Sequence, residues 1–390
     1  MRLSTLGAAI AAFALVAPPA FANNEGITSD AVVFAQVAAM DGPASALGTG
    51  MRDGIMAAFE EANGNGGVHG RMVSLDTFDD GYEPDQSVAH VRTVIDGNAH
   101  LGFIGPVGTP TTLATQPLAT DAGLPFVGPF TGAGFLRDSA FNNVVNVRAT
   151  YAAETEAWIA NLVDELGMDS IAILYQDDGF GRVGLSGVTA ALERRGMSLA
   201  AEGTYTRNTV AVKGALLEIR KAQPDAVVMV GAYRPIAEFI KLSRQLRFEP
   251  TFVNISFVGS QALADELGDA GEGVIISQVV PFPWDSSVPV VAEYQAAITA
   301  ADPDASPNFV TLEGYLVGRI ALRALEAAGP DVTRNSYLAA LANLGAFDLG
   351  GLSFAYGVGD NQGLDDVFLT RIAAGGGFET VIASEDLASR

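Results

Sequence analysis

The sequence predicts an α/β protein with two lobes and a cleft between them. Short apolar runs rich in β-branched residues alternate along the chain with helical patterns, which is typical of parallel sheets covered on both faces. This alternation falls into two blocks, at about 27–147 and 150–277. The length of 390 residues is also sufficient for two domains of ordinary size.

Each block alternates expected strands with helices. In the first block the strands are 31–38, 71–78, 101–105 and 125–129, and the helices are 45–63, 84–97 and 111–122. In the second block the helices are 151–167, 181–196, 209–222 and 234–246, and the strands are 170–176, 199–205, 226–231 and 251–256. The spacing of apolar residues distinguishes the two kinds of segment.

Two further sections complete the chain. Residues 283–345 have an almost wholly helical pattern and need a sheet to cover, most simply the first one. The tail from residue 350 reads as strands joined by the turns GDNQG and AGGG, which predicts hairpins. We therefore expect two Rossmann-like lobes joined by a hinge of several crossings that favours closure. The N-terminal lobe takes 23–147 and 280–347, and the C-terminal lobe takes 148–279 and 348–390.

The first 22 residues have the pattern of a secretory signal. Arg2 precedes an apolar stretch, and Ala20-Phe21-Ala22 has the form of a cleavage site. The stretch is short for a membrane span, so an uncleaved anchor is the less favoured alternative. We expect cleavage near Ala22-Asn23 and a periplasmic location.

Composition narrows the function classes. The chain has no cysteine, which excludes disulfides, thiolate metal sites and a cysteine nucleophile. Without the signal it carries 21 basic and 45 acidic residues, a net charge of −24. Such a charge argues against nucleic acid and anionic lipid as partners, and we expect a monomer kept apart by self-repulsion.

The stretch FIGPVGTPTT, residues 103–112, is the most informative loop. It joins an expected strand to a helix, and it lacks the lysine of a phosphate-binding loop. Free backbone N–H groups around Thr111 and the Thr109 hydroxyl suit a single carboxylate at a helix N-terminus. The alternative is that Thr109 is only a helix N-cap. The turn PFTGAGFLR at 129–137 ends the next strand, so both turns meet at one sheet edge and favour a shared anion site.

No set of residues indicates catalysis or a metal. His69, His90 and His100 share no metal-ligand spacing. Adjacent aspartates such as Asp177-Asp178 point to opposite faces and are more typical of turns, although Asp177 ends a strand that faces the cleft. We find no nucleophile with its base, and we expect no cofactor.

The mature chain as a whole resembles the periplasmic solute-binding proteins of ABC importers, in the leucine/isoleucine/valine-binding family with the type I periplasmic binding fold. The resemblance begins with MDGPASALGTGMRDGIMAAFEEANGNGGVHGRMVSLDTFDDGYEPDQSVA. The segments IGPVGTPTT, PFVGPFTGAGFLR, NVRATY and LYQDDGFGRVG follow in the family's order. The resemblance implies a receptor that closes over a small ligand and delivers it to a cognate permease in the inner membrane.

The resemblance also implies ligand contacts. The loop of Thr109 and the segment of Phe130, Thr131 and Gly132 would hold the ligand's carboxylate, and Phe180 and Tyr233 match aromatic positions of the family. The full expected set is Thr109, Pro110, Phe130, Thr131, Gly132, Tyr151, Asp177, Phe180, Tyr233, Ser256, Trp284 and Glu313.

The sequence departs from the family pattern at two places. Ser256 stands where branched-chain amino-acid binders carry an acid that pairs with the ligand's ammonium, so Asp177 or Glu313 replaces that acid, or the ligand has no amine. Leu47 stands where relatives often carry an aromatic lid, which leaves room for a larger ligand or for Trp284 as lid. Arg148, at the first crossover, either pairs with a carboxylate or packs in the hinge.

We therefore expect a binding protein for an amino acid or a related small organic acid, with aromatic acids as an alternative. A ligand-sensing subunit of a membrane receptor is a second hypothesis. A secreted enzyme is a third and is disfavoured because the sequence offers no acid/base pair.

Overall fold

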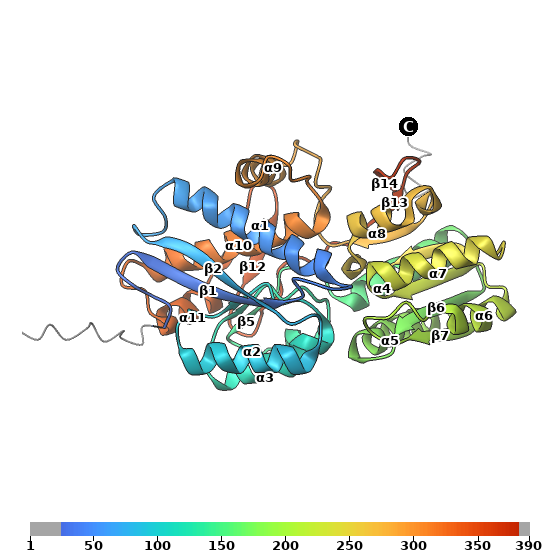
Figure 1. Cartoon of the computed structure of the whole chain (residues 1–390), viewed down its shortest axis with the longest axis horizontal. Helices are drawn as coiled ribbons and strands as arrows, with labels where there is room; N and C mark the ends of the chain where they lie inside the picture. Colours follow the sequence, from blue (N-terminus) through green and yellow to red (C-terminus); the bar gives the residue numbers. More distant parts are fainter. Residues whose placement is uncertain (1–24, 382–390) are drawn as a thin grey trace, which may run out of the picture.

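The computed structural model describes residues 25–381, which form two lobes that lie end to end (Figure 1). The expected signal at 1–22 lies outside the described residues. Among the described helices, none is long and apolar enough to cross a membrane. The expected fold class is confirmed: both lobes are built on largely parallel sheets with helices around them.

The sheet of the N-terminal lobe has the order β2-β1-β3-β4-β5 and is parallel throughout. Its strands are β1 (Ala31–Ala38), β2 (Met72–Asp79), β3 (Phe103–Ile104), β4 (Phe126–Val127) and β5 (Val144–Val145). Its helices from the same part of the chain are α1 (Ser45–Gly64), α2 (Pro84–Gly97), α3 (Thr109–Asp121) and the 3₁₀ turn η1 (Gly134–Arg137).

Alternating side chains of β1 divide the N-terminal lobe into two apolar layers. Phe34 belongs to the large core, whereas Ala35 and Val37 belong to a smaller core with Val91 and Val94 of α2. The helices α2 and α3 lie together on one face of the sheet, and α1 and α10 lie on the other (Figure 1). Successive side chains of a strand point to opposite faces of the sheet, so a strand covered on both faces contributes to both layers.

Three helices from late in the sequence complete the N-terminal lobe. They are α9 (Pro289–Ala301), α10 (Phe309–Ala328) and α11 (Arg334–Ala342). Both α9 and α10 pack against α1, and α11 packs against α10. Glycines make the α1–α10 contact close, because a Cβ at Gly54 would lie 2.0 Å from a carbonyl oxygen of α10.

The sheet of the C-terminal lobe has the order β14-β13-β10-β9-β8-β6-β7. Its strands are β6 (Ile171–Gln176), β7 (Ala201–Tyr205), β8 (Ala226–Val230), β9 (Thr251–Asn254), β10 (Ile275–Gln278), β13 (Phe368–Ile372) and β14 (Phe378–Thr380). The first five of these pair in parallel, and β13 and β14 add antiparallel strands at one edge.

The helices of the C-terminal lobe follow its strands. They are α4 (Tyr151–Ile159) with the π-helical turn η2 (Ala160–Glu165), α5 (Gly179–Glu193), α6 (Lys213–Ala222), α7 (Tyr233–Gln245), η3 (Ser256–Val258), α8 (Ser260–Leu267) and η4 (Gly268–Gly271). α4 packs against α5, and α7 packs against both α6 and α8. α5, α7 and η3 begin just after the carboxyl ends of β6, β8 and β9, where open α/β sheets bind ligands.

The tail differs from the prediction at one of its two turns. The AGGG turn does join an antiparallel pair, β13 and β14. The GDNQG turn does not join two paired strands. Instead, β12 (Ser353–Tyr356) pairs antiparallel with β11 (Gly345–Asp348), which precedes it in the chain, and the two form a separate sheet. The competing turn at 349–352 closes this hairpin, and the stacked rings of Phe347 and Phe354 support it.

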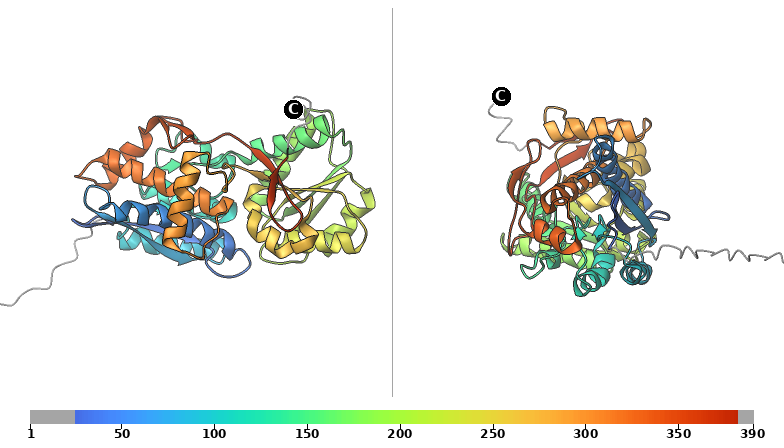
Figure 2. Two further views of the ribbon diagram at one scale, coloured as in Figure 1. Left: turned by 90° about the horizontal axis from the view of Figure 1, so that it is seen from above. Right: turned by 90° about the vertical axis from the view of Figure 1, so that its left-hand side faces the viewer.

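The hairpin also changes the lobe boundary. The Tyr356 hydroxyl donates to the carbonyl of Asn146 at 2.9 Å, and the Leu364 N–H donates to that of Val147 at 2.8 Å. Residues 345–364 thus lie on the N-terminal lobe, although the sequence assigned everything from 348 onward to the other lobe. The chain passes between the lobes after β5, after β10 and before β13 (Figure 2).

Candidate functional site

The N-terminal lobe presents two loops at the carboxyl ends of β3 and β4. They lie side by side because Val107 forms a parallel bridge with Phe130. The hydroxyl oxygens of Thr109 and Thr131 are 2.7 Å apart, and both side chains are buried. The two turns that the sequence indicated therefore meet at one point.

Gly108 determines how Thr109 is presented. It is the N-cap of α3 with φ of 102°, and a Cβ there would lie 2.2 Å from a ring carbon of Tyr82. Only glycine combines that backbone with that contact. Thr109 is consequently the first residue of the helix, so the alternative that it serves as the N-cap is wrong.

The other two threonines in the first turn of α3 have hydroxyls that donate to backbone carbonyl groups. Pro110 occupies a position where a helix has no need of an N–H. The Thr111 hydroxyl donates to the carbonyl of Val107 at 2.5 Å, and the Thr112 hydroxyl donates to that of Gly108. Of the three threonines in this turn, Thr109 is the one whose hydroxyl contacts the opposite loop.

Tyr151, the first residue of α4, brings a third hydroxyl to this point. It is fully buried, and its hydroxyl neighbours those of Thr131 and Thr109 without a well-formed hydrogen bond to any described residue. Burial raises the pKa of this phenol, against the opposing charge of Arg148. Gly132 permits the approach, because a Cβ there would lie 2.6 Å from the Tyr151 ring.

The three hydroxyls form a donor cluster, defined here as Thr109, Thr131 and Tyr151. One threonine hydroxyl donates to the other, which leaves one threonine O–H and the Tyr151 O–H without an acceptor in the described residues. The partial positive charge of the α3 N-terminus adds to them. The cluster can thus bind one carboxylate.

Aromatic rings from both lobes surround the donor cluster. Phe257, from η3 of the C-terminal lobe, has its ring centroid 5.4 Å from that of Phe130, 4.7 Å from that of Phe180 and 5.9 Å from that of Tyr82. Sequence reasoning missed Phe257 and Tyr82. Phe257 follows Ser256, which was singled out, but no local pattern indicates that its ring reaches the other lobe.

The expected aromatic contacts of the C-terminal lobe lie in the same region. Phe180 is buried at the start of α5, where the Asp178 side chain caps the helix, and its ring lies 5.5 Å from that of Tyr151. The Tyr233 hydroxyl accepts a long hydrogen bond of 3.4 Å from the Ala46 N–H of the N-terminal lobe. Leu47, next along the chain, is fully buried against Gly259.

Arg148 and Glu313 form a buried ion pair beside these rings. The guanidinium donates from Nε at 2.8 Å and from Nη2 at 2.9 Å to the two carboxylate oxygens. Burial alone would lower the pKa of Arg148, but the Glu313 charge raises it above its ordinary value. Arg148 therefore pairs with a protein carboxylate, and Glu313 is already engaged.

Glu154 is a second buried carboxylate, which sequence reasoning also missed. It accepts from the Ser256 N–H and the Ser256 hydroxyl at 2.9 Å each, and from the Ser277 hydroxyl at 2.5 Å. Burial raises the pKa of Glu154, while Arg148 and these hydrogen bonds oppose the shift. Ser256, which the sequence singled out, is thus bound to a buried acid of α4.

Two expected site residues lie apart from the donor cluster. Asp177 is half exposed and pairs with Arg182 at 2.6 Å. Trp284 is 38% exposed and packs among Phe282, Phe309 and Phe378. The structure does not bring either residue into the ring of aromatic side chains around Phe257.

The edge of the cleft carries polar contacts between the lobes. Arg207 of the C-terminal lobe pairs with Glu83 at 2.7 Å and with Asp178 at 3.0 Å. Asn208 donates to the Glu83 carboxylate at 2.7 Å and to the Gly81 carbonyl at 3.0 Å. We call Glu83, Arg207 and Asn208 the edge latch, because they join the two lobes outside the aromatic cluster.

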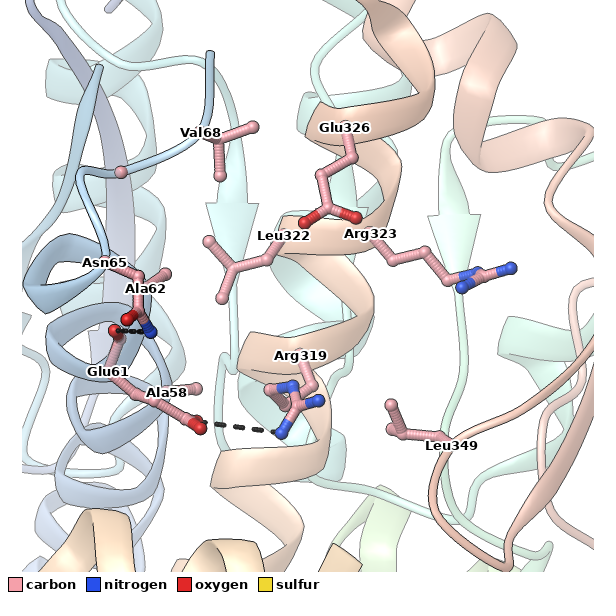
Figure 3. Close-up of a pocket in the computed structure, with 11 residues that line it drawn as sticks. Ala58, Glu61, Ala62, Asn65, Val68, Arg319, Leu322, Arg323, Glu326 and Leu349 are labelled. Carbon is pink, nitrogen blue, oxygen red and sulfur yellow. Dashed lines mark hydrogen bonds and ion pairs between the residues drawn. The ribbon is translucent and has the colours of Figure 1, made fainter. Parts of the chain in front are cut away.

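A different pocket lies on the N-terminal lobe between α1 and α10 (Figure 3). Arg319 in this pocket is 3.6 Å from Glu61 and 2.7 Å from Glu293. None of the expected site residues lines it. Among the described residues no group of histidines and acids could hold a metal ion.

Comparisons with known proteins agree with this fold. Residues 31–377 match the family described as "Periplasmic binding protein". A possible leucine/isoleucine/valine-binding protein from Rhodopirellula baltica SH 1 has a similar crystal structure, with a TM-score of 0.87 and 38% identity over 92% of this chain and 98% of that one. A substrate-binding periplasmic protein from Ralstonia solanacearum has a TM-score of 0.84 and 27% identity, over 90% of this chain and 100% of that one.

A curated relative supports the same family assignment. The Leu/Ile/Val-binding protein homolog 7 from Brucella melitensis is 24% identical over 298 residues, which cover 73% of this chain and 74% of the relative. These relatives are named as binding proteins and not as enzymes. The resemblance inferred from the sequence is confirmed, and the chain belongs to the periplasmic binding protein family.

Proposed function

We propose that this protein is a solute receptor of an ABC-type importer, which closes its two lobes over a small carboxylate ligand. The donor cluster carries this proposal. It holds two spare O–H donors at a helix N-terminus, between lobes that three chain segments connect. Spare buried donors favour an anion, since unpaired polar groups are costly away from water.

The rings of Tyr82, Phe130, Phe180 and Phe257 favour an apolar or aromatic body on that carboxylate. Relatives named for leucine, isoleucine and valine support an amino acid or a related acid with a branched side chain. In this proposal the protein acts as a monomer in the periplasm and delivers its ligand to a cognate permease. No step of the proposal requires a catalytic residue.

Calorimetry with a series of carboxylates tests the proposal. Branched-chain and aromatic acids should bind, and their amides should bind much more weakly. Thr109→Val should weaken a bound carboxylate by roughly 1–3 kcal/mol, because a charge-assisted hydrogen bond is lost.

Thr115→Val is the matched control. Thr115 is a buried threonine of the same helix, and its hydroxyl donates to the carbonyl of Thr111. Equal losses in the two variants, or binding of amides as tight as that of acids, would contradict a carboxylate at the donor cluster.

A further inference from the structure

The Arg148 guanidinium has a hydrogen-bonding capacity that its ion pair does not use. Nε and Nη2 bind Glu313, but Nη1 is buried and has no hydrogen-bond partner among the described residues. The side chain is only 1% exposed. A buried cationic N–H without an acceptor is rare and costly, so it marks a place where an acceptor is expected.

Arg148 lines a small cavity between the lobes. The lining brings Phe130 and Glu313 of the N-terminal lobe together with Ser256 and Gln278 of the C-terminal lobe. The cavity has a volume of about 10 Å³, which suits one water-sized group. It therefore accommodates a single polar atom of a ligand rather than a whole side chain.

The other polar side chains around this cavity already have hydrogen-bond partners. The Gln278 amide donates to Ser260 and Thr370, and its oxygen accepts from Ser260. The Ser256 hydroxyl donates to Glu154, and the Glu313 carboxylate is bound to Arg148 at both oxygens. Among the polar side chains that line this cavity in the described residues, the spare capacity is thus the donor at Arg148 Nη1.

Charge decides what kind of acceptor fits. Glu313 already neutralises Arg148, and Glu154 places another buried acid behind Ser256. A second carboxylate would therefore add an uncompensated negative charge to a dry site, which is strongly unfavourable. An ammonium is equally unsuited to a spare donor, because it accepts no hydrogen bond. An uncharged oxygen, such as a ketone, matches both the charge and the hydrogen bond.

Phe130 makes this cavity a neighbour of the donor cluster. It precedes Thr131 in the chain, and its ring lies under the guanidinium with the Arg148 Cζ 4.2 Å from the ring centroid. Tyr151 of the cluster, the first residue of α4, follows Arg148 by three residues in the chain. The cavity and the donor cluster thus adjoin the same segment, Phe130-Thr131.

We propose that Arg148 Nη1 binds an uncharged acceptor oxygen close to the ligand's carboxylate, so that the preferred ligands are 2-oxo acids rather than 2-amino acids. This inference rests on the proposed function, because it places the carboxylate at the donor cluster. It makes Arg148 a residue that determines specificity.

Matched ligands with one carbon skeleton test the inference on the purified wild-type protein. Calorimetry would compare leucine, 4-methyl-2-oxopentanoate and 4-methylpentanoate, and also phenylalanine, phenylpyruvate and 3-phenylpropanoate. In at least one skeleton the oxo acid should bind about 10–100-fold more tightly than the unsubstituted acid, the range expected for a hydrogen bond to a charged group. The oxo acid should also bind more tightly than the amino acid. A dicarboxylate of similar size should bind more weakly than the oxo acid.

The double variant Arg148→Met/Glu313→Met removes the donor without leaving a buried charge unpaired. Its ratio of affinities for oxo and unsubstituted acids should fall to about 1–3-fold, and the ratio cancels any general effect on closure. If this variant does not fold, the wild-type series decides alone.

Three results would overturn the inference while leaving the proposed function intact. They are tighter binding of the amino acid, equal binding of the oxo and unsubstituted acids, and an oxo preference that persists in the double variant. If no carboxylate of either series binds, the proposed function and the inference both fail.

Discussion

Glu154 is a buried carboxylate that connects several parts of the C-terminal lobe. Its oxygens accept hydrogen bonds from Ser256 and Ser277, which join α4 to two strand ends of the C-terminal lobe. We expect Glu154→Ala to lower the free energy of unfolding by roughly 2–4 kcal/mol, because buried donors lose a charged acceptor. Glu154→Gln should change it by about 1 kcal/mol or less in either direction, because one acceptor is kept and the buried charge, which burial disfavours, is removed. Urea denaturation measures both.

Glu156, two residues further along α4, provides the control for Glu154. It is 38% exposed and pairs with Arg194 and Arg195 on the surface. Surface pairs contribute little, so Glu156→Ala should change the free energy of unfolding by less than about 1 kcal/mol. A loss at Glu156 equal to that at Glu154 would contradict the role assigned to the buried serine contacts.

Asp80 is a buried acid whose charge depends on pH. Burial raises the pKa of Asp80 to about 6, although Ser87 and the Tyr82 N–H donate to its carboxylate. The folded protein therefore binds a proton more tightly here than the unfolded chain does, and this contribution to stability is lost as the pH rises through about 6. Neighbouring charges at Asp79 and His90 act in opposite directions.

Asp80→Asn should remove this dependence, because the amide stays uncharged. At pH 7 the variant should gain roughly 1–3 kcal/mol relative to the wild type. Between pH 6 and pH 4 the two free energies of unfolding should converge, as the wild-type carboxyl becomes protonated. Denaturation curves at several pH values check this, and a difference that stays constant with pH would argue against a raised pKa.

Residue-level prediction from the sequence succeeded where the chemistry is local and stopped where it depends on folding. The hydroxyl-rich turns at Thr109 and Thr131 were identifiable because each follows an expected strand. The acid that reaches Ser256 was not, because Glu154 lies 102 residues away in the chain. Glu313, offered as a replacement for the family's acid, is paired with Arg148, and no sequence spacing could show that.

At the scale of elements, the short segment η3 is where the two lobes meet. Its Phe257 ring packs on Phe130 and Tyr82 of the N-terminal lobe and fills the space beside the donor cluster. This apolar contact stabilises the arrangement of the two lobes that the structure shows. A ligand with an aromatic body would compete with Phe257 for the same rings.

Phe257→Ala should therefore open the ligand-free protein. Small-angle X-ray scattering should give a larger radius of gyration for the variant than for the wild type. Phe252→Ala is the control, because Phe252 packs on Phe239 inside the C-terminal lobe. That variant should lose roughly 3–5 kcal/mol of stability without a change in radius. An unchanged radius in Phe257→Ala would show that this ring does not hold the lobes together.

Elements were predictable where one signal dominates. The parallel strands of both sheets and the helices between them follow from alternating apolar segments, and their order along the chain is confirmed. The tail was harder, because turn signals at 349–352 and at GDNQG compete for the same strand. β12 pairs with β11 through the first of these. Only the packing of Phe347 on Phe354, which the sequence does not reveal, favours that choice.

At the scale of the whole molecule, an apolar contact and the edge latch join the two lobes. Arg207 lies between Glu83 of one lobe and Asp178 of its own. If the ligand binds the closed form, any contact present only on closure adds to the observed affinity. The charged groups of the latch are partly exposed, so their contribution to ligand affinity should be modest and should decrease as the salt concentration rises.

Glu83→Gln tests the latch, because it removes one charge while the Asn208 hydrogen bond can still form. Ligand affinity should fall by up to about fivefold at low salt, corresponding to an exposed pair of at most about 1 kcal/mol, and the loss should shrink at high ionic strength. Glu218→Gln is the control, since Glu218 pairs with Lys221 on one helix of the C-terminal lobe. Calorimetry at two salt concentrations distinguishes the outcomes. An equal loss of ligand affinity in the control would reflect overall charge. Unchanged affinity in Glu83→Gln would mean that the latch does not contribute to closure.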